Sequence, residues 1–85
     1  MNIKDKASRI RQLQKDPVFQ DVIQEIRERQ TNVFLNADSS QDDLKGAHDI
    51  IRALNQIDIY FNSVYSEEAM YDKQQLKGQH RVRRD

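Results

Sequence analysis

The residues best suited to catalysis are two histidines, and neither has the setting of an active-site base. His48 is followed directly by Asp49, and His80 lies close to the C-terminus. A general base needs a pocket and an orienting partner, and the sequence contains no serine or lysine with the features of an activated nucleophile. The sequence therefore predicts a protein that is not an enzyme.

Three aspartates, Asp38, Asp42 and Asp43, are close enough in sequence to attract a hard cation. They lack the spacing and the glycine of a calcium-binding loop, and carboxylates at this point also suit the positive start of a helix. The chain contains no cysteine, which excludes thiolate zinc sites. We therefore expect no metal, no other cofactor and no small-molecule substrate.

The basic C-terminal end is the best candidate for a binding element. Arginine makes bidentate contacts with phosphate, and a basic tail binds polyanions without sequence specificity. Three interpretations stay open: contact with nucleic acid, docking on an acidic patch of a neighbouring subunit, or a solvated tail. The acidic patch would draw on Asp42, Asp43, Asp49, Glu67 and Glu68. The residues predicted to contact a polyanion or an acidic partner are Lys73, Lys77, Arg81, Arg83 and Arg84.

The charges are arranged in three blocks, although the net charge of the chain is zero. Residues 1–15 have a balance of +4, residues 16–72 of −8, and residues 73–85 of +4. Unlike blocks on neighbouring copies attract each other, whereas like blocks repel. The acidic middle would also repel nucleic acid, so any such contact would use the two ends of the chain.

The elements that must position these groups are helices. Apolar residues spaced three and four apart predict a short helix over residues 3–14 and a second helix over residues 17–35. Asp16-Pro17 separates them, because proline starts helices well and the preceding aspartate can cap one. The apolar stripe of the second helix consists of Phe19, Val22, Ile23, Ile26, Val33 and Phe34.

A polar loop at residues 36–40 precedes the longest apolar pattern of the chain, over residues 41–65. Ser40 and Asp43 resemble a capping box at its start. Two long helices joined by a short loop favour antiparallel packing. We predict an all-α fold: an antiparallel helical hairpin of about residues 17–35 and 41–65, with a short N-terminal helix and a C-terminal helical extension.

Further signals divide the C-terminal part of the chain. Ser66-Glu67-Glu68 has the composition of another helix start, and Gly78 is a natural helix stop. Whether a separate helix begins at Ser66 is left open by the pattern. Residues 1–77 are therefore expected to form a single helical domain, and residues 78–85 a mobile basic tail.

The long helix carries a second apolar line beside its main stripe, which consists of Leu44, Ala47, Ile51, Leu54, Phe61 and Tyr65. Ile50, Ile57 and Val64 form the second line and recur every seven residues. Asp58 lies where the main stripe expects an apolar residue. Its carboxylate must therefore be paired, hydrated or at the edge of the stripe. A helix that is apolar over this much of its circumference packs against more than one neighbour. The N-terminal helix can cover the second line, a partner protein can cover it, and both can be true. The predicted protein interface consists of Ile50, Ile57, Ile59, Tyr60 and Val64.

Length and composition agree with a small helical protein that has much exposed surface. Of the 85 residues, 36% are hydrophobic and 33% charged, which is more polar than the average globular domain. The sequence contains no membrane-spanning apolar run and no signal peptide, so we expect a protein that is neither secreted nor membrane-spanning.

Part of the chain resembles a family of small proteins of tailed bacteriophages and prophages. The resemblance covers about residues 10–65 and is carried by Asp16-Pro17-Val18-Phe19, Leu44-Lys45-Gly46-Ala47-His48 and Ile51-Arg52-Ala53-Leu54. Such proteins are encoded among head-assembly and DNA-packaging genes. The resemblance implies a role in virion assembly in the host cytoplasm, leaves open whether the protein stays in the mature particle, and implies no functional residues.

The sequence as a whole predicts a non-enzymatic structural or assembly protein that oligomerises or docks on another virion protein through its helices. Two alternatives come from other classes. One is a small nucleic-acid-binding or DNA-packaging accessory protein that uses its basic termini. The other is a phage inhibitor of a host protein.

Overall fold

The computed structural model describes the backbone of residues 1–84 and the side chains of residues 1–76. The regular secondary structure of this part of the chain consists of helices alone. It consists of α1 (Ile3–Lys15), α2 (Pro17–Leu35) and α3 (Gln41–Arg84), with no strand among residues 1–84. The predicted all-α class is therefore confirmed.

Side chains outside the helices define where each helix begins. The Asn2 side chain accepts a hydrogen bond from the Asp5 backbone N–H at 2.8 Å, which caps α1. Asp16 ends α1 and caps α2, because its carboxylate accepts from the Val18 and Phe19 backbone N–H groups at 2.8 and 3.0 Å. The predicted helix boundary at Asp16-Pro17 is confirmed.

The predicted capping box at the start of α3 is also present. The Ser40 backbone N–H donates to the Asp43 carboxylate, and the Asp43 backbone N–H donates to the Ser40 hydroxyl, both at 3.0 Å. The hydrogen bond from the Ser40 backbone is the main cause that lowers the pKa of Asp43. Asp43 therefore has a structural role, which accounts for it without a metal ion.

The expected helix stop at Gly78 is absent, and the question left open at Ser66 is answered by one continuous helix. α3 continues as one helix through Ser66 and Gly78 to Arg84, so neither a new start nor a stop interrupts it. Glu67, Glu68 and Ala69 are as favourable inside a helix as at its start, and one glycine costs a helix only about 1 kcal/mol. The expected mobility of the tail at residues 78–85 concerns side chains that lie outside the described residues.

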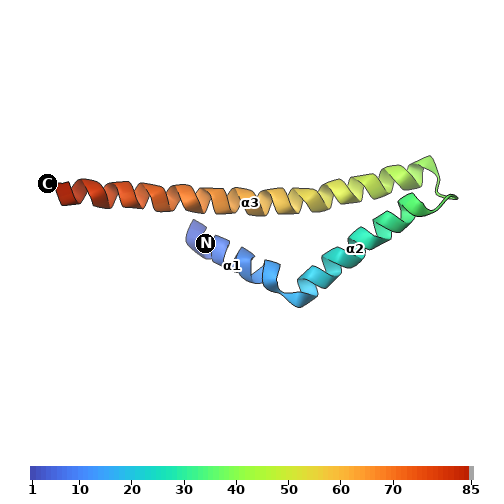
Figure 1. Cartoon of the computed structure of the whole chain (residues 1–85), viewed down its shortest axis with the longest axis horizontal. Helices are drawn as coiled ribbons and strands as arrows, with labels where there is room; N and C mark the ends of the chain where they lie inside the picture. Colours follow the sequence, from blue (N-terminus) through green and yellow to red (C-terminus); the bar gives the residue numbers. More distant parts are fainter. Residues whose placement is uncertain (85) are drawn as a thin grey trace.

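Both shorter helices contact α3 (Figure 1). α2 is joined to α3 by the loop at one end of the molecule. α1 turns away from the line of α2 at Asp16-Pro17 and reaches the middle of α3, whose C-terminal part extends beyond it. These contacts are consistent with the expected hairpin.

The core is centred on α1 and α3. Ala7 and Ile10 of α1 pack with Phe61 and Val64 of α3, while α2 contains no buried residue. Ala47 and Leu54 of α3 are the other buried apolar side chains among the described residues. Val22, expected to pack inside the hairpin, is 46% exposed, because α2 faces α3 with the neighbouring line of half-buried residues: Phe19, Ile23, Ile26, Gln30 and Val33.

The molecule is long and thin, with extents of 72 × 25 × 19 Å. Its radius of gyration is 19.8 Å, whereas a compact domain of this length has about 12 Å. The accessible surface is 7118 Å², compared with about 5,300 Å² for a compact monomer of this mass. The fold therefore leaves far more surface open than an ordinary small domain does.

Candidate interaction surface

The predicted interface residues do not share one environment. Ile50 and Ile57 are 41% and 38% exposed, and Ile59 and Tyr60 are more exposed still. Val64 is only 2% exposed, because it packs in the core under α1. Including Val64 in an external interface was therefore wrong: within the chain, α1 already covers it.

Two of these residues belong to an apolar face that is still open. Gly46 and Ala53 stand seven residues apart, as do Ile50 and Ile57, and these four alternate at spacings of four and three. They therefore line one side of α3, which we call the open seam. Ile59 follows Ile57 by two residues, which turns it by about 200° around the helix axis and places it on another side.

The bend at Asp16-Pro17 explains why the open seam ends where it does. α2 lies over the main stripe of α3, where Ala47 and Leu54 are buried. α1 lies further along α3 and covers Phe61 and Val64. The contacted face of α3 therefore shifts around the helix between α2 and α1. Ile50 and Ile57, beside α2 but short of α1, stay about two-fifths exposed.

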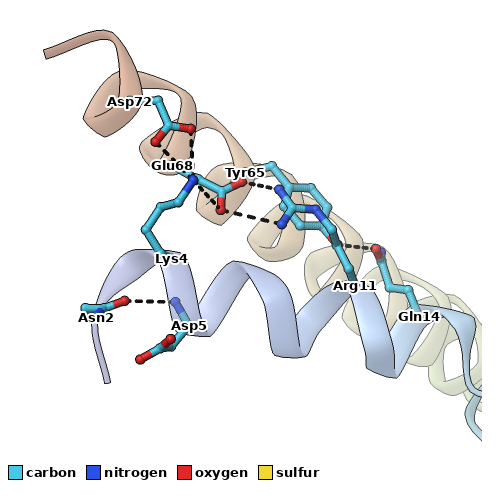
Figure 2. A network of polar contacts seen from close by, with 8 residues as sticks. All are labelled: Asn2, Lys4, Asp5, Arg11, Gln14, Tyr65, Glu68 and Asp72. Atoms are coloured by element: carbon cyan, nitrogen blue, oxygen red, sulfur yellow. Dashed lines mark hydrogen bonds and ion pairs between the residues drawn. The ribbon is translucent and has the colours of Figure 1, made fainter. Parts of the chain in front are cut away.

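A charged cluster fixes α1 on α3, and we call it the latch: Lys4, Arg11, Glu68 and Asp72 (Figure 2). The Arg11 guanidinium donates to both carboxylate oxygens of Glu68. The Lys4 ammonium group lies 3.4 Å from the Glu68 carboxylate and 3.0 Å from that of Asp72. Two cations of α1, seven residues apart, therefore hold two carboxylates of α3.

Electrostatics follow this geometry. The hydrogen bond from Arg11 lowers the pKa of Glu68, helped by the nearby charge of Lys4, while partial burial opposes the shift. The pKa of Lys4 is raised, chiefly by its hydrogen bond with Asp72, and that of Arg11 is raised by its hydrogen bond with Glu68. Each of these groups is therefore held in its charged form.

The latch was not predicted from the sequence, and it corrects the expectation for Glu68. Glu68 is only 7% exposed and is already paired inside the chain, so it is not open to a basic tail. A usable signal was present, since Lys4 and Arg11 share one face of α1 beside Ala7 and Ile10. The sequence did not show, however, that α1 packs on α3, so the partners of these two cations could not be assigned.

Aromatic residues complete the contact of α1 with α3. The Lys6 ammonium group lies 4.8 Å from the centroid of the Tyr60 ring and donates to its hydroxyl. The Arg11 guanidinium carbon lies 5.2 Å from the centroid of the Tyr65 ring, whose hydroxyl donates to Gln14. Tyr60 is therefore a half-exposed side chain at the edge of α1, next to the open seam.

Asp58 is both paired and exposed, which are two of the three alternatives that the sequence left open. Its carboxylate accepts a hydrogen bond from Arg27 of α2 at 3.2 Å, and the same guanidinium group reaches Asn55 at 3.2 Å. The Asp58 side chain is 61% exposed. The carboxylate thus lies at the edge of the stripe and links α2 to α3.

The predicted basic contact residues extend beyond the latch along α3. Lys73 is exposed and follows Asp72, the last residue of α3 that has a charged contact with α1 among the described side chains. The side chains of Lys77, Arg81, Arg83 and Arg84 lie outside the described residues, while the helix backbone runs to Arg84. The basic block at the C-terminal end thus continues the same helix that carries the open seam.

The side chains best suited to chemistry stay dispersed within the part of the chain with described side chains. His48 is exposed, and no group of three or more histidine or acidic side chains there could hold a metal ion. A hollow of about 300 Å³ lies where α1 and α2 bend away from α3, lined in part by Phe19, Leu54 and Phe61. It brings together no nucleophile and base.

None of the described helices combines the length and the apolar character that crossing a membrane requires.

Comparison with known proteins identifies no relative: no protein-family model, curated protein or solved structure matches the chain.

Proposed function

We propose that this chain is a non-enzymatic assembly protein that acts through helix-mediated self-association or by docking on a larger particle. The observation that carries the proposal is the open seam of α3, where Ile50 and Ile57 stay about two-fifths exposed in a chain with very few buried apolar side chains. Burying this face against a partner would remove apolar surface from water, which favours association.

The helices would act as one elongated unit. In this proposal residues 17–35 and 41–65 form the antiparallel hairpin, α1 covers one end of it, and the rest of α3 is the helical extension. The contacts of α2 with α3 and the bridge from Arg27 to Asp58 support this arrangement. The latch supports it at the other end by holding α1 in place.

The resemblance of residues 10–65 to small tailed-phage proteins supports a role in the virion or in head morphogenesis. A rod-like helical protein with zero net charge and oppositely charged blocks suits repeated contacts in a particle. Its place would be the host cytoplasm during assembly.

Sedimentation velocity over a wide concentration range tests self-association. We expect the sedimentation coefficient to rise with concentration, because the open seam becomes buried between copies. A monomer that persists at the highest concentration would exclude self-association. Docking on a particle protein would then be decided by a binding assay with the products of the neighbouring genes.

A second candidate is nucleic-acid binding, favoured by one specific observation. α3 continues beyond the latch into residues 73–84, which contain five basic residues and no acidic one. Binding through these residues would weaken steeply with salt and would be lost when Arg81, Arg83 and Arg84 are all replaced by alanine. Fluorescence anisotropy with double-stranded DNA and with RNA measures both effects. No binding at low salt would eliminate this candidate.

A further inference from the structure

The open seam has a residue that packing inside the chain does not explain. A Cβ atom added to Gly46 would meet no heavy atom within 4 Å. Glycine weakens a helix relative to alanine, so neither intrachain packing nor helix stability accounts for it. Gly46 and Ala53 lie one above the other on the open seam, and small residues there allow a second helix to approach closely.

The seam is complementary to itself when two copies run in opposite directions. With a twofold axis near residue 52, Gly46 faces the partner's Ile57, and Ile50 faces the partner's Ala53. Each isoleucine then meets a small residue, which is the large-against-small alternation that fills the space between two helices. A twofold contact requires this kind of self-complementary patch.

The amount of exposed surface also fits a second copy. The chain exposes about 1,800 Å² more than a compact monomer of its mass, since it has 7118 Å² instead of about 5,300 Å². One partner in a standard stable interface contributes about 800 Å². After burying this area in a dimer, each copy would therefore still expose more surface than a compact monomer of its mass.

Charge decides between the two possible directions. In a parallel pair, both basic C-terminal ends, each with a balance of +4, would lie side by side, as would the α1 cations that the latch does not pair. In an antiparallel pair, Asp38 of the loop and the acidic start of α3, with Asp42 and Asp43, approach the basic α1 of the other copy. Repulsion thus disfavours the parallel pair, and attraction favours the antiparallel one.

We propose that the open seam binds the same seam of a second copy, with the two α3 helices antiparallel and crossing near residue 52. α1 limits how far the second copy can extend along α3, because it already covers Phe61 and Val64. The inference rests on the proposed function, since it names the partner that the assembly protein takes first.

A matched pair of charge insertions tests the seam. Ile57→Lys places a charge in the middle of the proposed interface, and we expect the dimer dissociation constant to rise at least about tenfold. Ile59→Lys is the control, because Ile59 is 57% exposed and lies on another side of the same helix. Circular dichroism on both variants checks that the helices are retained.

The direction of the helices is tested by a distance measurement. The chain contains no cysteine, so Gln75→Cys provides one labelling site per copy. Two spin labels at this position should lie about 70 Å apart in the antiparallel dimer, given the 1.5 Å rise per residue, and within about 20 Å in a parallel one. Pulsed electron paramagnetic resonance distinguishes these values.

The outcomes separate this inference from the proposed function. A wild-type dimer that Ile57→Lys leaves intact, or that Ile59→Lys weakens equally, overturns the seam but leaves self-association standing. A short distance between the labels overturns the antiparallel arrangement alone. A wild-type chain that stays monomeric overturns the inference, and the proposed function then depends on docking to another particle protein.

Discussion

Glu68 shows how one carboxylate can decide where a helix lies. It is 7% exposed and sits in α3 opposite Arg11 and Lys4 of α1. A carboxylate with so little access to water needs charged or hydrogen-bonding partners, and here α1 provides both cations. The position of α1 on α3 therefore depends on polar as well as apolar contacts.

We predict that Glu68→Gln lowers the melting temperature at neutral pH and removes part of the acid sensitivity of the fold. Arg11 lowers the pKa of Glu68 in the folded chain, whereas the unfolded chain titrates near the ordinary value of about 4.3. The stabilisation is therefore complete above that value and is lost as the pH falls through the lower folded-state pKa. Thermal melts at a series of pH values measure it.

Glu67→Gln is the matched control for this prediction, because Glu67 is the exposed neighbour of Glu68. Its melting temperature should stay close to that of the wild type throughout the series. If the two variants respond to acid in the same way, the latch does not hold α1.

At the residue level, the sequence predicted local contacts well and distant ones poorly. The Asp16 cap and the box of Ser40 with Asp43 follow from neighbours in sequence, and both are present. The Arg11–Glu68 pair joins residues 57 positions apart. Such a pair depends on how the helices pack, which local spacing does not determine.

Among the elements, α1 contributes more to the core than its length suggests. Two of the four residues in the core cluster, Ala7 and Ile10, come from this helix of 13 residues. The longer α2 supplies no buried residue. The fold therefore depends on α1 staying docked, although the sequence placed the main packing between α2 and α3.

We predict that Ile10→Ala destabilises the fold by about 2–4 kcal/mol, because it removes a buried side chain and leaves a cavity beside Phe61 and Val64. Urea denaturation followed by circular dichroism measures this free energy. Leu13→Ala, at a 42% exposed position of the same helix, should cost less than about 1 kcal/mol. Equal losses in the two variants would contradict the described position of α1.

Gly46→Ala separates the stability of α3 from its association. The added Cβ meets nothing inside the chain, so we predict that dilute protein gains about 1 kcal/mol in its free energy of unfolding. In a dimer joined at the open seam, the same methyl group would press on the partner's helix, and the dissociation constant should rise. Urea denaturation and sedimentation on one sample series measure both quantities.

The opposite result would be a lower dissociation constant of the Gly46→Ala dimer. If Gly46→Ala strengthens the dimer as well as the helix in this way, Gly46 does not face a partner and the proposed register is wrong. The inverse control is Ala53→Gly. This change weakens the helix, but it should leave room for the partner's helix at the open seam. Ala37→Gly is unsuitable for this purpose, because Ala37 lies in the loop before α3.

Periodicity identified the helices but not their full extent or their neighbours. The line of Ile50, Ile57 and Val64 was visible in the sequence, and the structure divides it: α1 covers Val64 and leaves the two isoleucines partly open. The bend at Asp16-Pro17 sets this division. Its position was predictable, whereas its direction depends on packing in three dimensions.

The elongated shape of the whole molecule predicts how long the proposed dimer is. The single chain is 72 Å long. In the proposed dimer the axis lies near residue 52, so about 32 residues of each α3 extend away from it in opposite directions, about 48 Å on each side at 1.5 Å per residue. The antiparallel dimer should therefore span about 95 Å, whereas a parallel dimer would stay close to the length of one chain. Small-angle X-ray scattering on the separated dimer measures this maximum dimension, and a value near 72 Å would exclude the antiparallel arrangement.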